Sequence, residues 1–211
     1  MRRFVLVFLA GLILAGCAST SLQSAWFDSS YSGPPFKRIL VVGVTSSFTD
    51  RRVFDDSFAQ MLNGAGVQGI PGYQFIDNAP SVNETVFNEG VTRSGADAVL
   101  LVRLLGVDTR TQVSTTMVPA MYGGPFAGPF GSPIGPYGPY GPWGPAWYAV
   151  PDYRQYQVAN VEATLFDTKT HRPIWSATTQ TFNPSSVAAE TPGYAKLVIG
   201  QLTARGLLAG K

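Results

Sequence analysis

The segment from Pro119 to Pro151 limits the possible folds more than any other part of the chain, because it contains no Asp, Glu, Lys, Arg or His. Within it, Gly135–Pro145 repeats Gly-Pro-aromatic with a period of three. The repeat is too short for a collagen helix, and its aromatic residues stand where imino acids are needed. Proline cannot donate to a helix or a strand ladder, and glycine is entropically costly to fix. We therefore expect a long, mobile, partly polyproline-II insertion at 119–151 that divides one domain into two halves.

The first half predicts three strands, at 39–44, 73–76 and 98–107, because each segment is rich in apolar or aromatic residues. The run at 39–44 is continuous, which is typical of a strand buried in a parallel sheet, and 98–107 is expected to be a third buried strand. After the insertion, apolar and polar residues alternate from Ala159 to Leu165, as in a strand with one wet face. A turn at 167–173 and a Thr-rich strand at 174–182 complete an antiparallel hairpin.

Three helices are expected between and after these strands. Asp50 can cap the first helix, whose apolar residues recur at helical spacing before it ends at Gly64 and Gly66: Phe54, Phe58, Met61 and Leu62. A capping-box pattern at 81–84 starts the second helix, which Gly95 stops. The last helix follows Pro184. The order strand-helix-strand-helix-strand, hairpin, helix predicts a single α/β domain at 36–211 with a mixed sheet, in two or three layers.

The first sixteen residues have the pattern of a secretory signal peptide. Arg2 and Arg3 precede an apolar run of about 11 residues, shorter than the roughly 20 that a membrane span needs. The run ends in Leu14-Ala15-Gly16-Cys17, which resembles the lipobox of bacterial lipoproteins. The resemblance implies cleavage before Cys17 and acylation of its sulfur and its new amine. Three acyl chains exceed what stable anchoring requires.

The residues after Cys17 bear on localisation and organisation. In lipoproteins of this kind, an Asp directly after the cysteine commonly retains the protein in the inner membrane. Here that position is Ala18, so the resemblance favours the periplasmic face of the outer membrane. Residues 17–35 are polar and interrupted by glycine and proline, and we expect them to form a lipidated tether. Cys17 is also the only cysteine, which excludes an intrachain disulfide.

Charge excludes nucleic acid as a partner. Cleavage removes Arg2 and Arg3 from the 15 basic residues, which leaves 13 against 13 acidic residues. A chain without a basic excess gives no support for nucleic-acid binding, which needs a concentrated basic face.

Five segments carry a resemblance to known proteins: 37–44, 51–58, 95–102, 165–168 and 173–176. They resemble a family of uncharacterised proteobacterial periplasmic lipoproteins, over most of the mature chain. More remotely, they are similar to the α/β domains of the curli-secretion lipoprotein and of lipoproteins that activate peptidoglycan synthases. The resemblance implies an envelope location and no catalytic residues.

Several patterns that could indicate an active site have simpler explanations. Gly64–Gly69 matches Gly-x-Gly-x-x-Gly, but it would end a helix and precede a strand, the wrong order for a dinucleotide loop. His171, the only histidine, falls in the expected turn, so no metal site or catalytic triad is predicted. Asp55 and Asp56 are adjacent and should point to different faces of a helix. Arg51 and Arg52 could bind an anion, but the prediction is a solvated helix start.

The aromatic residues of the insertion are the best candidates for partner binding, because exposed aromatic clusters mark binding surfaces. The alternative is a low-complexity spacer folded loosely over the sheet. We expect a non-enzymatic binding or scaffold module with no cofactor and no metal, whose partner is an envelope or peptidoglycan-associated protein. The alternative is an oligomeric component of an envelope export or pore assembly. The candidate residues are Tyr122, Phe126, Phe130, Tyr137, Tyr140, Trp143, Trp147 and Tyr148.

Overall fold

The computed structural model describes residues 20–77, 83–119 and 147–210. The chain divides into two compact units. One unit comprises Met1–Asp108 and Gln157–Lys211, and we call its described part the body. The other comprises Thr109–Tyr156, and we call its described part the ribbon.

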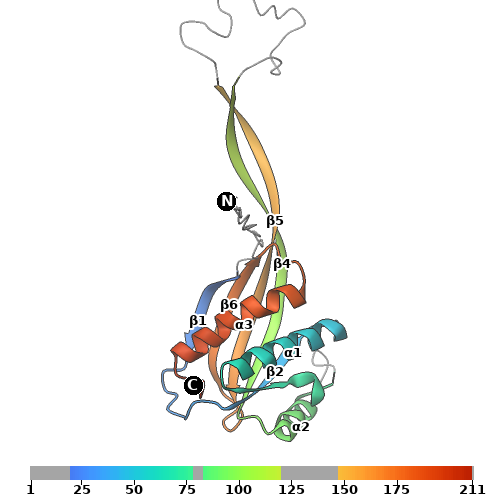
Figure 1. Ribbon diagram of the computed structural model, residues 1–211, viewed down its shortest axis with the longest axis vertical. Coiled ribbons are helices and arrows are strands. Elements are labelled where there is room, and N and C mark those ends of the chain that lie inside the picture. The colour runs from blue at the N-terminus through green and yellow to red at the C-terminus, as the bar shows by residue number, and fades with distance from the viewer. Residues whose placement is uncertain (1–19, 78–82, 120–146, 211) are drawn as a thin grey trace, which may run out of the picture. The chain divides into compact units, whose positions relative to one another are not determined.

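A six-stranded mixed sheet contains every described strand, in the order β1-β6-β5-β4-β2-β3 (Figure 1). β2 pairs in parallel with both β3 and β4, whereas β6 pairs antiparallel with β1 and β5. The α/β fold with a mixed sheet and a hairpin is therefore confirmed. The strands are β1 (Thr20–Phe27), β2 (Arg38–Val44), β3 (Gln68–Pro71), β4 (Ala98–Pro119), β5 (Trp147–Asp167) and β6 (Pro173–Phe182).

Helices cover the two faces of the body's sheet unequally. α1 (Phe48–Gly64) and α3 (Val187–Ala204) lie side by side on one face, where Phe58 and Val198 pack into the larger core with Val41 and Leu100 (Figure 1). α2 (Glu84–Ser94) lies on the opposite face and covers a smaller core that includes Leu40. The body therefore has three layers where α2 covers the sheet and two elsewhere.

Side-chain caps fix where the helices begin. Ser47 is the N-cap of α1, and its hydroxyl accepts from the Asp50 N–H, so Asp50 lies in the first turn instead of capping it. Asn83 caps α2 in the same way through the Val86 N–H. Gly95 ends α2 with φ of 62°, a left-handed conformation that glycine adopts without strain, as the sequence predicted.

Two other expectations at the sheet edges are wrong. The strand expected at 73–76 is instead β3 at Gln68–Pro71, followed by the short 3₁₀ helix η1 (Gly72–Gln74), because backbone pairing with β2 begins at Arg38 with Gln68. Part of the expected tether at 17–35 is strand β1, which pairs with β6 from Thr20 with Thr181 onward. An edge strand buries little, so its polar sequence does not prevent pairing.

β4 and β5 extend further than the sequence predicted. β4 continues to Pro119 and β5 already begins at Trp147, so the ends of the expected insertion are strand. Backbone pairing needs no apolar core, and the Thr- and Val-containing sequence at 109–116 favours extended backbone. The remaining insertion, 120–146, lies outside the described residues. No helix in the described part of the chain is long and apolar enough to cross a membrane.

Candidate functional site

A cavity of about 270 Å³ lies where β2 ends, between the sheet and the first turns of α1 and α3. We call it the apolar pocket. In open α/β sheets, ligands bind beyond the carboxyl ends of parallel strands, and the pocket occupies that place next to β2 and β4. Its lining residues are Gly43, Val44, Thr45, Asp50, Phe54, Val102, Leu104, Val107, Ala159, Val161, Thr181, Pro184, Ser185, Ser186, Val187, Glu190, Thr191 and Tyr194.

Aliphatic and aromatic side chains form most of the pocket wall, and several polar groups at its lining are already engaged in capping α3. The Ser186 hydroxyl accepts from the Ala189 N–H. The Glu190 carboxylate accepts from both the N–H and the hydroxyl of Ser185. Such a wall suits an apolar ligand, because most of its binding energy would come from burial of apolar surface.

Tyr194 brings one buried polar atom to this wall. Its ring packs against Phe54 and Phe58, with centroid separations of 6.2 Å in both cases. Its hydroxyl is buried and has no hydrogen-bond partner among the described residues. Burial raises the pKa of the Tyr194 phenol, and the negative charge of Glu162 adds to this shift. The phenol is therefore neutral at physiological pH.

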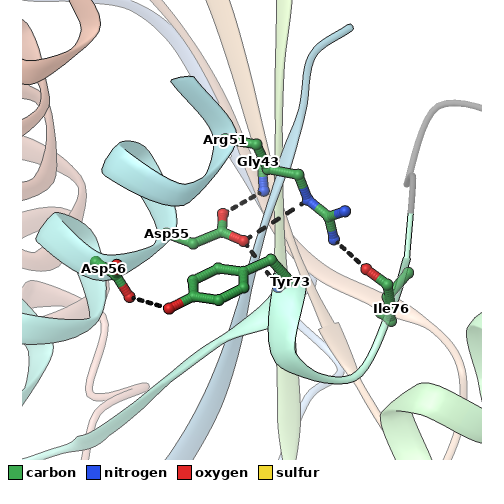
Figure 2. Close-up of polar contacts among 6 residues, drawn as sticks. All are labelled: Gly43, Arg51, Asp55, Asp56, Tyr73 and Ile76. Carbon is green, nitrogen blue, oxygen red and sulfur yellow. Dashed lines mark hydrogen bonds and ion pairs between the residues drawn. The ribbon is translucent and has the colours of Figure 1, made fainter. Parts of the chain in front are cut away.

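A buried polar network holds α1 against the sheet behind the pocket (Figure 2). The Asp55 side chain is fully buried, and its Oδ1 accepts from the Gly43 N–H at 2.8 Å. Its Oδ2 accepts from the Tyr73 N–H at 3.1 Å and lies 3.8 Å from Nε of Arg51. Nη2 of Arg51 donates to the Ile76 carbonyl at 2.7 Å. The pair thus joins α1 to β2, to η1 and to the residues after η1.

Burial shifts the ionisation of both members of this pair. Removal of Asp55 from water raises its pKa to about 7, while hydrogen bonds from the Gly43 and Tyr73 N–H groups and the charge of Arg51 act in the opposite direction. Burial lowers the pKa of the Arg51 guanidinium, which the carboxylates of Asp55 and Asp77 counteract. The network therefore depends on closely balanced electrostatic interactions.

Gly43 links the network to the pocket. A Cβ atom at this position would lie 2.9 Å from the Phe54 ring and 3.1 Å from Oδ1 of Asp55. Glycine is therefore required for α1 to approach β2 closely enough for the Gly43–Asp55 hydrogen bond. Since Gly43 and Phe54 both line the pocket, the network sets the position of that wall.

The expectation of a solvated helix start is wrong for Arg51, whose side chain is only 2% exposed. Arg52 is exposed, and its guanidinium lies over the rings of Phe48 and Tyr73, at 4.3 and 5.0 Å from their centroids. Asp56 is exposed and accepts from the Tyr73 hydroxyl at 3.0 Å. Asp55 and Asp56 point to different faces, as the sequence predicted, but Asp55 faces the core.

The other sequence motifs lie where they were expected. The Gly64–Gly69 segment ends α1 and leads into β3, which is the wrong arrangement for a phosphate loop. His171 is an exposed turn residue between β5 and β6, with φ of 56°. In the described part of the chain, no three His, Cys, Asp or Glu side chains are grouped as metal ligands would be.

The predicted lipidation and partner-binding residues cannot be placed in the same way. The signal peptide and Cys17 lie outside the described residues, as do Tyr122, Phe126, Phe130, Tyr137, Tyr140 and Trp143. The backbone of Trp147 and Tyr148 belongs to β5, but their side chains are outside the described part as well. These assignments stay predictions.

Sequence reasoning missed the apolar pocket and the Arg51–Asp55 network. The network did leave a signal, because Arg51, Asp55, Phe58 and Leu62 recur at helical spacing and therefore share one face of α1. A charged pair on the stripe that buries Phe58 and Leu62 indicates a buried ion pair. The pocket left no such signal, because it forms only where three segments distant in the sequence meet.

No family model matches the sequence, and no curated protein matches it. The fold is similar to that of the PelC dodecamer from Paraburkholderia phytofirmans in two crystal forms, one of them of a point variant. The TM-scores are 0.44 for the variant and 0.42 for the other form. In both cases the sequence identity is 13%, and the match covers 89% of this chain and 99% of the PelC chain. Lipoprotein GNA1162 from Neisseria meningitidis is similar at a TM-score of 0.39, with 15% identity, covering 79% of this chain and 98% of that chain. These similarities are remote and concern the fold alone.

Proposed function

We propose that the chain is a lipid-anchored, non-enzymatic binding module of the cell envelope, held through Cys17 on the periplasmic face of the outer membrane. The signal peptide and the Leu-Ala-Gly-Cys sequence support the anchor. The binding role rests on the ribbon, which is a compact unit of two strands whose residues from Thr109 to Thr116 are all exposed. A two-stranded ribbon is marginally stable alone in water, so a partner that covers it would stabilise it.

The chemistry of the ribbon favours a protein or peptidoglycan-associated partner over a charged ligand. The whole stretch from Thr109 to Tyr156 contains only three charged residues, Arg110, Asp152 and Arg154. Two of these, Asp152 and Arg154, form an ion pair at 2.9 Å. Exposed Val113 and Tyr153 add apolar surface, at 59% and 66% exposure. Recognition would therefore depend on backbone pairing, aromatic contacts and apolar burial.

In-cell photocrosslinking tests this role. A photoreactive residue is placed at Val113 or at Tyr153 in the ribbon, and at Phe48 on the body as the matched control, because all three side chains are more than half exposed. We expect one envelope protein to be captured from both ribbon positions and not from Phe48. Capture from Phe48 alone would move the binding surface to the body and overturn the assignment to the ribbon.

Self-association in an export or pore assembly is the second candidate, and the open edges of the ribbon favour it. β2 pairs with β4 only as far as Arg103, and β6 pairs with β5 only from Val158 onward. Beyond these positions the described chain supplies no third strand to the ribbon. Strands of a second copy could pair there, because an open edge presents unpaired backbone groups.

Native mass spectrometry of the full-length protein in detergent separates the two candidates. A monomer that captures a different protein supports the binding module. A defined oligomer whose crosslinks from Val113 join two copies of this chain supports the assembly.

A further inference from the structure

We propose that the apolar pocket holds one of the acyl chains carried by the protein's own Cys17. The inference rests on the lipid anchor of the proposed function. It adds that one of the three acyl chains can lie in the pocket instead of in the bilayer. The described chain begins at Thr20, beside the pocket, and Cys17 precedes that residue by three positions in the sequence.

β1 begins beside the pocket, within a few residues of Cys17 in the sequence. Thr20, the first described residue, pairs with Thr181 of β6, and the two hydroxyl groups are 2.9 Å apart. Thr181 lines the pocket. Cys17 precedes Thr20 by three residues, which span at most about 11 Å when fully extended. An acyl chain that reaches the midplane of a bilayer adds about 15 Å, half of the hydrocarbon thickness. The chain on Cys17 can therefore reach the pocket.

The walls and size of the pocket suit a single acyl chain. Val102, Val107, Val161 and Val187 present aliphatic groups to it, and Phe54 adds a ring. Its volume of about 270 Å³ lies just below the roughly 300–1,000 Å³ of typical ligand sites, so it has room for one unbranched chain at most. Two chains suffice for stable anchoring, so the third can leave the bilayer without release of the protein.

Charge disfavours a fatty acid or an anionic phospholipid as the occupant of the pocket. The only charged residues that line the pocket are Asp50 and Glu190, and both are acidic. Carboxylates at this position would repel the head group of a fatty acid or of an anionic phospholipid. The acyl chains of the anchor are attached to Cys17 through uncharged links. Tethering also raises the local concentration of this chain at the pocket, whereas a free lipid must be recruited.

A photoactivatable palmitate, with its reactive group at the end of the acyl chain, tests the inference in growing cells that make the full-length protein. After irradiation, mass spectrometry identifies the peptides joined to the labelled chain. We expect crosslinks within one protein between the Cys17 lipid and peptides that contain Val107 or Val187.

Two variants in β4 make the test specific. Val107 lines the pocket and is 48% exposed, whereas Leu105 does not line it and is 50% exposed. Val107→Trp should fill the pocket and reduce the intrachain crosslink at least five-fold, while Leu105→Trp should leave it unchanged. Melting temperatures of both variants show that each is folded.

Three results would overturn the inference. The first is a labelled Cys17 lipid that crosslinks only to other lipids, and the second is an intrachain crosslink that Val107→Trp does not reduce. The third is a pocket peptide labelled by phospholipid with none from Cys17, which would make the occupant a membrane lipid. If Cys17 carries no label at all, the anchor of the proposed function fails and the inference with it, which distinguishes that case from failure of the pocket alone.

Discussion

The same two strands, β4 and β5, have different surroundings in the body and in the ribbon. In the body, β4 buries Ala98, Leu100 and Val102 against α1 and α3, and β5 buries Ala163 and Leu165 on the same face. In the ribbon, every residue of β4 from 109 to 116 is exposed. Strand pairing is thus common to both units, and among the described residues only those of the body add a core to it.

The two sections of β4 differ in amino-acid composition, whereas both have the extended backbone of a strand. The body section of β4 is mostly apolar and is interrupted only by Arg103 before Asp108, whereas Thr109–Thr116 consists of Thr, Ser, Gln and Arg around a single Val113. Both sections form strands because Val and Thr favour extended backbone. Only the apolar section gains free energy from burial. We infer that the body holds nearly all of the stability, and the following substitutions test that division.

Phe58→Ala should have the largest effect. Phe58 is fully buried in α1 and packs against Phe54 and Tyr194. Loss of the ring leaves a cavity and should reduce the free energy of unfolding by about 3–5 kcal/mol, measured by denaturant unfolding. Tyr153→Ala in the ribbon removes a ring that is 66% exposed and is the matched control. A Phe58→Ala protein as stable as the control would contradict the division between the units.

Asp55→Ala should rank next. It leaves the Gly43 and Tyr73 N–H groups without their acceptor and Arg51 without its carboxylate. Removal of one member of a buried ion pair should cost about 3 kcal/mol. Asp56→Ala, at the neighbouring exposed position, removes only the bond from the Tyr73 hydroxyl and should cost less than about 1 kcal/mol. Equal losses in the free energy of unfolding of the two variants would mean that the buried contacts of Asp55 do not stabilise the fold.

The sequence predicted those parts of the body whose apolar pattern has a clear period. The strands expected at 39–44 and 98–107, the 159–182 hairpin and the helix end at Gly95 each depend on local pattern or local backbone preference, and all were found. β1 was missed because an edge strand with Trp26 half exposed has no clear apolar face. The pocket could not be predicted, because it depends on how closely α1 and α3 approach the sheet. The need for glycine at Gly43 follows from the packing of Phe54 and Asp55 against it, which the sequence alone does not show.

Val102 and Val113 permit the same substitution in two sections of one strand. Val102 is 5% exposed in the body, and Val113 is 59% exposed in the ribbon. Val102→Ala should reduce the free energy of unfolding by about 2 kcal/mol. Val113→Ala should change it by less than about 0.5 kcal/mol, as is usual for exposed positions. A loss at Val113 comparable to that at Val102 would show that the ribbon carries a core of its own.

The stability of the body should also depend on pH. Burial raises the pKa of Asp55 from its ordinary 3.8 to about 7, so the folded state binds a proton that the unfolded state releases. The stability that this group contributes is fully present below about pH 4 and is lost as pH rises through about 7. The melting temperature should therefore fall between pH 5 and pH 8, and Asp55→Asn should flatten that dependence. If Asp55→Asn leaves the dependence of the melting temperature on pH unchanged, another titrating group causes that dependence.

His171→Ala should have the smallest effect. It tests whether the loss in the free energy of unfolding depends on the burial of a side chain or on its position in the body. His171 belongs to the body, yet its side chain is exposed, as most described side chains of the ribbon are. Its N–H donates to the Asp167 carbonyl at 2.9 Å, a backbone bond that alanine retains. Its φ of 56° strains alanine about as much as histidine, so the free energy of unfolding should change by less than about 0.5 kcal/mol.

The His171→Gly protein should be slightly more stable than both the unmodified protein and His171→Ala, because glycine adopts this conformation freely. Partner capture in cells should also be unchanged in His171→Ala, and its loss would give the only histidine a functional role that the proposed binding module does not include.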